Sequence, residues 1–350
     1  MRPLAPPRDL AIPEPGSTTA RDVLSHAIGR LLRELRPLLR AHAASAPDDV
    51  AAVEGALSRL SEVAPLVSLL RRPHIGGLVR ALRATRPGDG DALLVELLAT
   101  LTGDLAHLGA IAPVTLRRRP PRVVSPVTGR DAYHAVEGDI LFALVDNNPL
   151  AMHEAHPDKD GNAIDLGGRG VDVWLASLRA ALGLVAKHLP DLRAEMSLYV
   201  RQMVPVGFFE DKHLSASYRE AIGTIYLSLH PSPMTMVEAV IHEFQHNKLN
   251  ALFESDEVLE NAHEPLYTSP VRPDPRPLHG VLLAVHAFLP VARLYERLIA
   301  AGVGGLEARF RDIMRINREG ADVLLANARP TAIGQGVLDE MARWQAHFRA

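Results

Sequence analysis

The sequence predicts an α+β protein in which helices predominate. Over several long segments, apolar residues recur at spacings of three and four, which is the period of amphipathic helices. A few shorter segments are instead rich in β-branched and aromatic residues, as strands are. A chain of 350 residues with 47% hydrophobic content is also long enough to bury a sizeable core. We therefore expect a helical bundle in the N-terminal third and helices mixed with a small sheet in the rest.

The N-terminal third divides into two parts. Residues 1–16 contain five prolines and predict an extended arm, and residues 17–116 predict a helical region. Within that region helical periodicity covers 23–44, 48–70, 74–86 and 90–110, with proline and glycine between the segments. Proline and arginine are then concentrated in 117–130, which we take as a boundary.

Residues 130–350 predict a second domain with both strands and helices. Residues 172–189 have the pattern of a helix, 196–208 that of one or two strands, and 223–230 that of a further strand. Ser232 or Thr235 is a candidate N-cap for a helix over 235–252. Another helix is expected over 282–300, followed by two more before the end of the chain.

The amino-acid composition limits which ligands and partners this protein is expected to bind. With 38 basic and 41 acidic residues, the formal charge of −3 gives no general attraction to nucleic acid. The chain has no cysteine, so any metal must be held by His, Asp or Glu. The N-terminus lacks the apolar run of a signal peptide, and we find no uncharged apolar segment of ~18 residues. We expect a cytoplasmic protein with no nucleic-acid or membrane partner, whereas the sequence leaves the oligomeric state open.

The segment His242-Glu243-Phe244-Gln245-His246 carries the strongest chemical signal, because it has the His-Glu-x-x-His spacing of zinc proteases. Residues four apart lie on one face of a helix, ~6 Å apart, so His242 and His246 are able to aim their imidazoles at one ion. Glu243 projects beside them and is a candidate catalytic residue. A strand followed by such a helix is the local order of zincin-like folds, so we expect a zincin-like core made of the small sheet and this helix.

Two histidines require a third ligand. The position used by metzincins is Leu252, which excludes that pattern. We favour His286, which lies among apolar residues in the middle of a predicted helix, and keep His279 as the alternative. An acid of the polar segment after the motif is a further possibility. Its three members are Glu254, Glu257 and Glu260.

The segments "HEFQHNKLNAL" and "YTSPVRPDPRPLHGVLLAVHAF" resemble a known family. This family comprises the HExxH-motif peptide-modification proteins encoded beside ribosomally made peptide natural products, described as α-ketoglutarate-dependent HExxH-type peptide β-hydroxylases. The resemblance is strongest over 135–300. It implies a zincin-like scaffold that binds iron(II) and uses α-ketoglutarate and O₂ to hydroxylate a side-chain β-carbon in a precursor peptide. At the level of single residues, the resemblance assigns site roles to His242, Glu243 and His246 only.

Further site residues are hypotheses that follow from this resemblance. α-Ketoglutarate needs a cation for its distal carboxylate, and Arg272 and Arg276 are the candidates. Asn247 and Asn250 follow the metal-binding histidines and are candidates for contact with the peptide.

Two other functions fit the motif. The first is a zinc metallopeptidase in which Glu243 is the general base. The second is a non-catalytic peptide-binding protein that keeps a vestigial metal site. Metal content and dependence on α-ketoglutarate separate these functions from the oxygenase.

Overall fold

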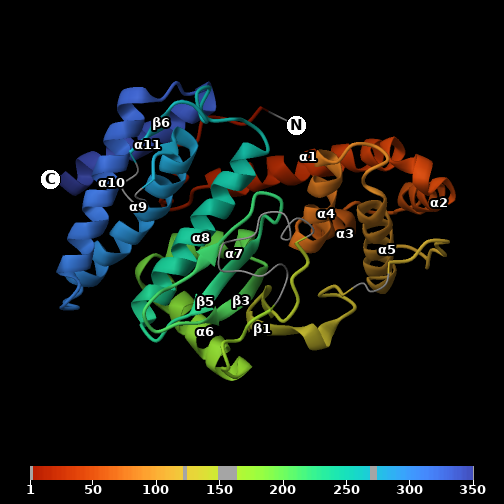
Figure 1. Cartoon of the computed structure of the whole chain (residues 1–350), viewed down its shortest axis with the longest axis horizontal. Helices are drawn as coiled ribbons and strands as arrows, with labels where there is room; N and C mark the ends of the chain where they lie inside the picture. Colours follow the sequence, from red (N-terminus) through yellow and green to blue (C-terminus); the bar gives the residue numbers. More distant parts are fainter. Residues whose placement is uncertain (1–2, 121–123, 149–163, 269–273, 350) are drawn as a thin grey trace. The chain divides into compact units, whose positions relative to one another are not determined.

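The computed structural model confirms the α+β class, with long helices and one small mixed sheet (Figure 1). It describes residues 3–120, 124–148, 164–268 and 274–349. Contacts group the chain into two units, and each is assembled from separate stretches of sequence. Unit 1 contains residues 1–27, 172–199 and 230–350, and unit 2 contains 28–171 and 200–229. The expected boundary at 117–130 therefore falls inside unit 2.

Unit 2 begins with the predicted helical region. Helix α1 (Thr19–Ala41) starts in unit 1 and continues into unit 2, where four more helices follow. These are α2 (Pro47–Ser58), α3 (Ala64–Leu70), α4 (Pro73–Ala84) and α5 (Asp91–His107). Proline occupies the first or second position of α2, α3 and α4, where its missing N–H costs no hydrogen bond. The expected helix over 48–70 is thus two helices.

The sheet also belongs to unit 2, and its strand order is β1-β2-β3-β5-β4. Its strands are β1 (Tyr133–Glu137), β2 (Ile140–Ala143), β3 (Gln202–Phe208), β4 (Ser215–Ala216) and β5 (Thr224–Leu229). β2, β3 and β5 run parallel, whereas β1 and β4 pair antiparallel at the two edges. The β1–β2 hairpin turns at Gly138, whose φ of 56° favours glycine. All of β5 is buried, as expected of a strand with neighbours on both sides.

One secondary-structure prediction was wrong. Residues 196–199 lie in helix α7 (Pro190–Tyr199), and only β3 forms a strand in the segment 196–208. Proline opens α7, and Leu192, Met196 and Tyr199 are buried at the helical spacings of four and three. The strand-forming residues of β3 follow this helix closely in the sequence. For this reason the strand pattern was predicted to begin too early, in the last turn of the helix.

Unit 1 is built from helices around the predicted metal-binding segment. They are α6 (Val171–His188), α7, α8 (Pro233–Phe253), α9 (Leu278–Ala300), α10 (Glu307–Asn327) and α11 (Ala332–Arg349), with a small ribbon of β6 (Leu266–Tyr267) and β7 (Arg276–Pro277). Helix α9 packs against α8, α10 and α11. Among the described helices, α9 alone is long and apolar enough to cross a membrane, yet 72% of its apolar window is buried inside the protein.

The N-terminal segment forms no helix or strand over residues 3–16, and it is anchored in the core of unit 1. Leu10, Ala11 and Ile12 are buried. The backbone N–H groups of Ala11 and Ile12 donate to the carboxylate of Glu340 in α11 at 2.9–3.0 Å. This segment therefore forms part of the packing around helix α8, to which Ala11 is also hydrogen-bonded through its carbonyl.

Candidate metal centre

Helix α8 places the two motif histidines on one rigid element. The Ser232 side chain accepts a hydrogen bond from the Thr235 N–H at 3.3 Å, and Pro233 occupies the first position of the helix. This confirms Ser232 as the N-cap. The helix then continues to Phe253 without glycine or further proline, so the motif lies near its centre, away from the fraying ends.

The side chains of His242 and His246 converge. Their Nε2 atoms are 2.9 Å apart, and their ring centroids are 4.4 Å apart with the planes at 85°. Two nitrogens that each bind one ion at about 2.0–2.1 Å lie roughly 3 Å from each other. The ligand atoms of His242, Glu243 and His246 all lie within 4.8 Å of one another. The geometry thus fits two imidazole ligands of a single divalent ion with a carboxylate beside it.

The electrostatic environment keeps His246 neutral. Burial lowers the pKa of His246 well below its usual value, and electrostatic interaction with the imidazoles of His242, His286 and His279 lowers it further. A neutral imidazole has a lone pair available, which a metal ligand requires. A divalent cation would therefore bind without first displacing a proton from this ring near neutral pH.

His286 on α9 is the better supported of the two candidates for the third ligand. Its side chain is fully buried, and neither ring nitrogen has a hydrogen-bond partner within the described part of the chain. A buried polar atom without a partner costs free energy, so such a group calls for a functional explanation. Burial and the charge of Lys248 also lower the pKa of His286 well below its usual value.

His279 has a different environment at the start of α9. Its ring lies 4.8 Å from that of Phe253 and 5.5 Å from that of His263, measured between centroids. Neither His279 nor His286 belongs to the three-residue cluster within 4.8 Å. The identity of the third ligand therefore stays a prediction. His286 is favoured over His279, because both ring nitrogens of His286 are buried without a hydrogen-bond partner among the described residues.

The acidic alternatives lie just beyond helix α8. Glu254 is the C-cap residue and is almost completely buried, whereas Glu257 and Glu260 follow in the connecting loop. The same three-residue cluster includes none of them.

Helix α8 is also anchored by buried polar contacts. Lys248 is fully buried, and its ammonium donates to Glu195 of α7 at 2.6 Å. The Gln245 side-chain amide donates to the Ala11 carbonyl at 2.9 Å. Sequence reasoning missed this role of Lys248, because nothing local in the sequence distinguishes a buried lysine from a solvated one. These contacts fix the rotation of α8 and hence the direction of its histidines.

The other predicted site residues are placed as follows. Asn247 is fully buried and donates from its side chain to the Glu243 carbonyl at 2.9 Å, and Asn250 is also buried. In this arrangement neither presents a surface to a peptide. Arg276 is partly exposed in β7 and forms an ion pair with Asp274 at 2.9 Å. Arg272 lies outside the described residues.

Comparison with known proteins adds no assignment to this geometry. No model of a protein family matches the sequence, and no curated protein matches it.

Proposed function

We propose that this protein is an iron(II)- and α-ketoglutarate-dependent oxygenase that hydroxylates a side-chain β-carbon in a ribosomally made precursor peptide. One structural observation carries the metal-dependent part of the proposal: the 2.9 Å approach of the His242 and His246 Nε2 atoms beside the Glu243 carboxylate. The choice of iron, co-substrate and peptide rests on the sequence resemblance. A zincin-like arrangement of the core belongs to the same proposal.

In this proposal three histidines are the protein ligands of the ion. His242 and His246 supply two nitrogens from one helix, and His286 supplies a third from α9. Three protein ligands would leave coordination positions for α-ketoglutarate and O₂. When bound, ferrous iron supplies the oxidising chemistry, in which O₂ and α-ketoglutarate are consumed, CO₂ and succinate are released and one oxygen atom enters the peptide C–H bond.

Arg276 is the described candidate for binding the distal carboxylate of α-ketoglutarate. Its guanidinium already pairs with a carboxylate, that of Asp274, and the Arg276 side chain is 38% exposed. An incoming dicarboxylate would exchange one carboxylate partner for another, in the bidentate geometry that arginine favours. Arg276→Ala is then expected to weaken binding of α-ketoglutarate while metal binding is retained.

A zinc peptidase is the second candidate, and the position of Glu243 favours it. The carboxylate is 98% buried and belongs to the same cluster as both histidines. A carboxylate beside a metal site is able to take a proton from a metal-bound water molecule, which is the role of this residue in HExxH proteases. Glu243→Gln would abolish such hydrolysis, whereas an oxygenase would keep its metal and part of its turnover.

The decisive experiment is anaerobic reconstitution with iron(II) followed by addition of α-ketoglutarate. The proposal predicts a weak visible metal-to-ligand charge-transfer band that is lost in His246→Ala. His107→Ala is the matched control, because His107 is exposed at the end of α5 and should leave the band unchanged. No band, together with tightly retained zinc and peptide cleavage that requires Glu243, would reject the oxygenase in favour of the peptidase.

A further inference from the structure

Unit 2 contains a cavity of about 270 Å³ that is separate from the histidine cluster in the sequence and in its chemistry. Its wall comes from the α3–α4 junction, the segment after residue 124, the β1–β2 hairpin and the start of β3. The lining residues are Ser68, Arg71, Arg72, Pro73, Pro126, Gly138, Asp139, Leu141, Arg201 and Gln202. Polar and charged side chains thus make up most of the wall.

Basic side chains predominate among the described residues of this wall. Three arginines line the cavity with one acidic residue, Asp139, which gives these described residues a formal net charge of +2. Asp139 reaches Arg201 at 3.2 Å, but its side chain is 87% exposed and therefore screens this charge weakly. Burial lowers the pKa of Arg201, and the charges of Arg71 and Arg72 lower it further. The charges of Arg71 and Arg72, which line the same cavity, thus act unfavourably on that of Arg201.

The fold holds these like charges together through the backbone. The Arg201 N–H donates to the Gly223 carbonyl at 2.9 Å, and the Arg201 carbonyl accepts from the Leu141 N–H at 3.0 Å. Arg201 is thereby fixed at the start of a central strand. Arg71 and Arg72 are the C-cap of α3 and the N-cap of α4, so the turn between two helices sets their positions.

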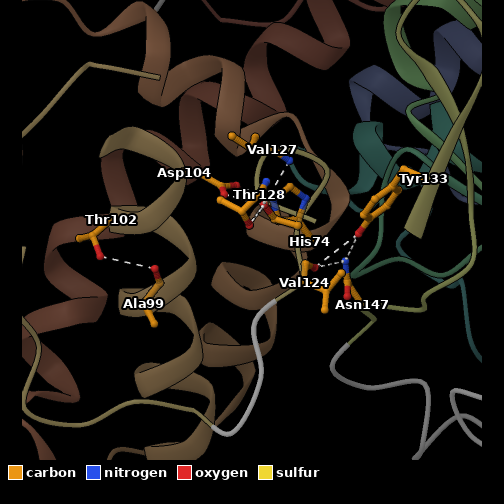
Figure 2. Close-up of polar contacts among 10 residues, drawn as sticks. His74, Ala99, Thr102, Asp104, Val124, Val127, Thr128, Tyr133 and Asn147 are labelled. Atoms are coloured by element: carbon orange, nitrogen blue, oxygen red, sulfur yellow. Dashed lines mark hydrogen bonds and ion pairs between the residues drawn. The ribbon is translucent and has the colours of Figure 1, made fainter. Parts of the chain in front are cut away.

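A buried polar network fixes two further parts of the wall, and Figure 2 shows two of its members, His74 and Asp104, close together. The Asp104 carboxylate of α5 contacts the Nε2 atom of His74 at 2.9 Å and accepts from the Ser125 hydroxyl at 2.6 Å. His74 directly follows the lining residue Pro73, and Ser125 directly precedes Pro126. Since all three side chains are at most 2% exposed, Asp104 ties both segments to the core of unit 2. The cavity is thus preorganised rather than a gap between loose loops.

We propose that this cavity binds the phosphate group of a small phosphorylated molecule. A phosphate monoester carries about −1.5 to −2 charges at pH 7, which matches the net charge of the wall. Guanidinium groups bind phosphate oxygens in a bidentate manner. The N-terminus of α4, opened by Arg72 and Pro73, adds the favourable end of a helix dipole to the same wall. The volume leaves room for a small organic group beside the phosphate, and it is below the range of pockets for drug-sized ligands.

The test is calorimetric titration of the full-length protein with inorganic phosphate, at an ionic strength held constant with sodium chloride. Wild type should bind phosphate more tightly than chloride, and Arg72→Ala should weaken phosphate binding about 10-fold or more. Arg201→Lys should weaken it less, because it keeps the charge and loses only the bidentate contact. Succinate titrated in parallel distinguishes a phosphate site from a general dicarboxylate site.

Arg117→Ala is the matched control. It removes the same charge from unit 2, but at a side chain that is 78% exposed and outside the cavity. An equal loss of affinity in Arg117→Ala and Arg72→Ala would overturn the proposal, as would succinate binding more tightly than phosphate or a wild type that does not distinguish phosphate from chloride. Far-ultraviolet circular dichroism establishes that each variant is folded. His246→Ala should bind phosphate like the wild type, because this inference does not depend on the metal centre.

Discussion

Two fully buried histidines, one in each unit, have opposite surroundings. His74 in unit 2 contacts the Asp104 carboxylate at 2.9 Å. His286 in unit 1 has no hydrogen-bond partner at either ring nitrogen among the residues described, and its charged neighbour is the cation Lys248. Burial lowers the pKa of both, but Asp104 partly offsets this for His74 whereas Lys248 adds to it for His286.

The difference separates a structural histidine from one that is suited to bind a ligand. His74 already uses Nε2 to hold two segments of unit 2 to α5 through Asp104. In the metal-free protein the imidazole of His286 does not contribute to stability through hydrogen bonds, because buried nitrogens without hydrogen-bond partners destabilise the folded state. A cation that is bound near His246 and also by one nitrogen of His286 would explain why the core of unit 1 contains this polar side chain. The predictions below test this contrast.

The largest expected effect concerns the cation beside His286. Lys248→Met removes the buried partner of Glu195, and breaking such a pair costs about 3–5 kcal/mol of unfolding free energy. The double variant Lys248→Met with Glu195→Leu should recover most of this loss, because no buried charge is then left without a partner. Urea denaturation measures both. Equal stability of the single variant and the wild type would show that the pair does not anchor α8.

The second prediction concerns metal affinity. His286→Leu should lower the affinity for iron(II) or zinc by about 100-fold or more, since even the loss of a residue that only supports a ligand costs 10–100-fold. His74→Leu should leave the affinity unchanged. Titration against a competing chelator gives both values. A normal affinity in His286→Leu together with a loss in His279→Leu would transfer the third-ligand role to His279.

The same two substitutions should have opposite effects on the metal-free protein. His74→Leu leaves Asp104 without one of its buried partners and should lower the unfolding free energy by about 2 kcal/mol. His286→Leu removes two unpaired buried nitrogens and should raise it by about 1 kcal/mol. Thermal denaturation in the presence of a chelator is the measurement. Destabilisation by both would indicate that His286 also has a structural role.

The last prediction concerns the dependence of stability on pH. Burial raises the pKa of Glu340 to about 7 from 4.5, so its contribution to stability is fully present below pH 4.5 and is lost as the pH rises through 7. The stability difference between wild type and Glu340→Gln should therefore fall by up to about 1.4 kcal/mol per pH unit in this window. His74 and His286, whose pKa values are lowered, act in the opposite direction but cancel in this difference. A constant difference from pH 5 to 8 would show that Glu340 does not titrate there.

Local patterns were sufficient for much of the fold. The apolar period and the N-cap candidate Ser232 predicted helix α8, and the spacing of His242 and His246 predicted their convergence, because both depend on residues close in sequence. By contrast, the pairing of Lys248 with Glu195 joins positions 53 apart. The arginine cavity likewise brings Arg72 and Arg201 together from distant segments. Such contacts depend on how elements pack, which periodicity does not describe.

The interleaving of the two units along the chain has a consequence for biosynthesis. Every residue of unit 2 has been added once the ribosome passes Leu229, whereas unit 1 still lacks α8 to α11. At translation rates of ~5–20 residues per second, roughly ten seconds separate the two stages. During that interval the nascent N-terminal segment has no Glu340 to bind, because α11 is made after every residue of unit 2. Completion of the histidine site in unit 1 therefore has to wait for the synthesis of α8 and α9, whereas all residues of the arginine cavity are made earlier.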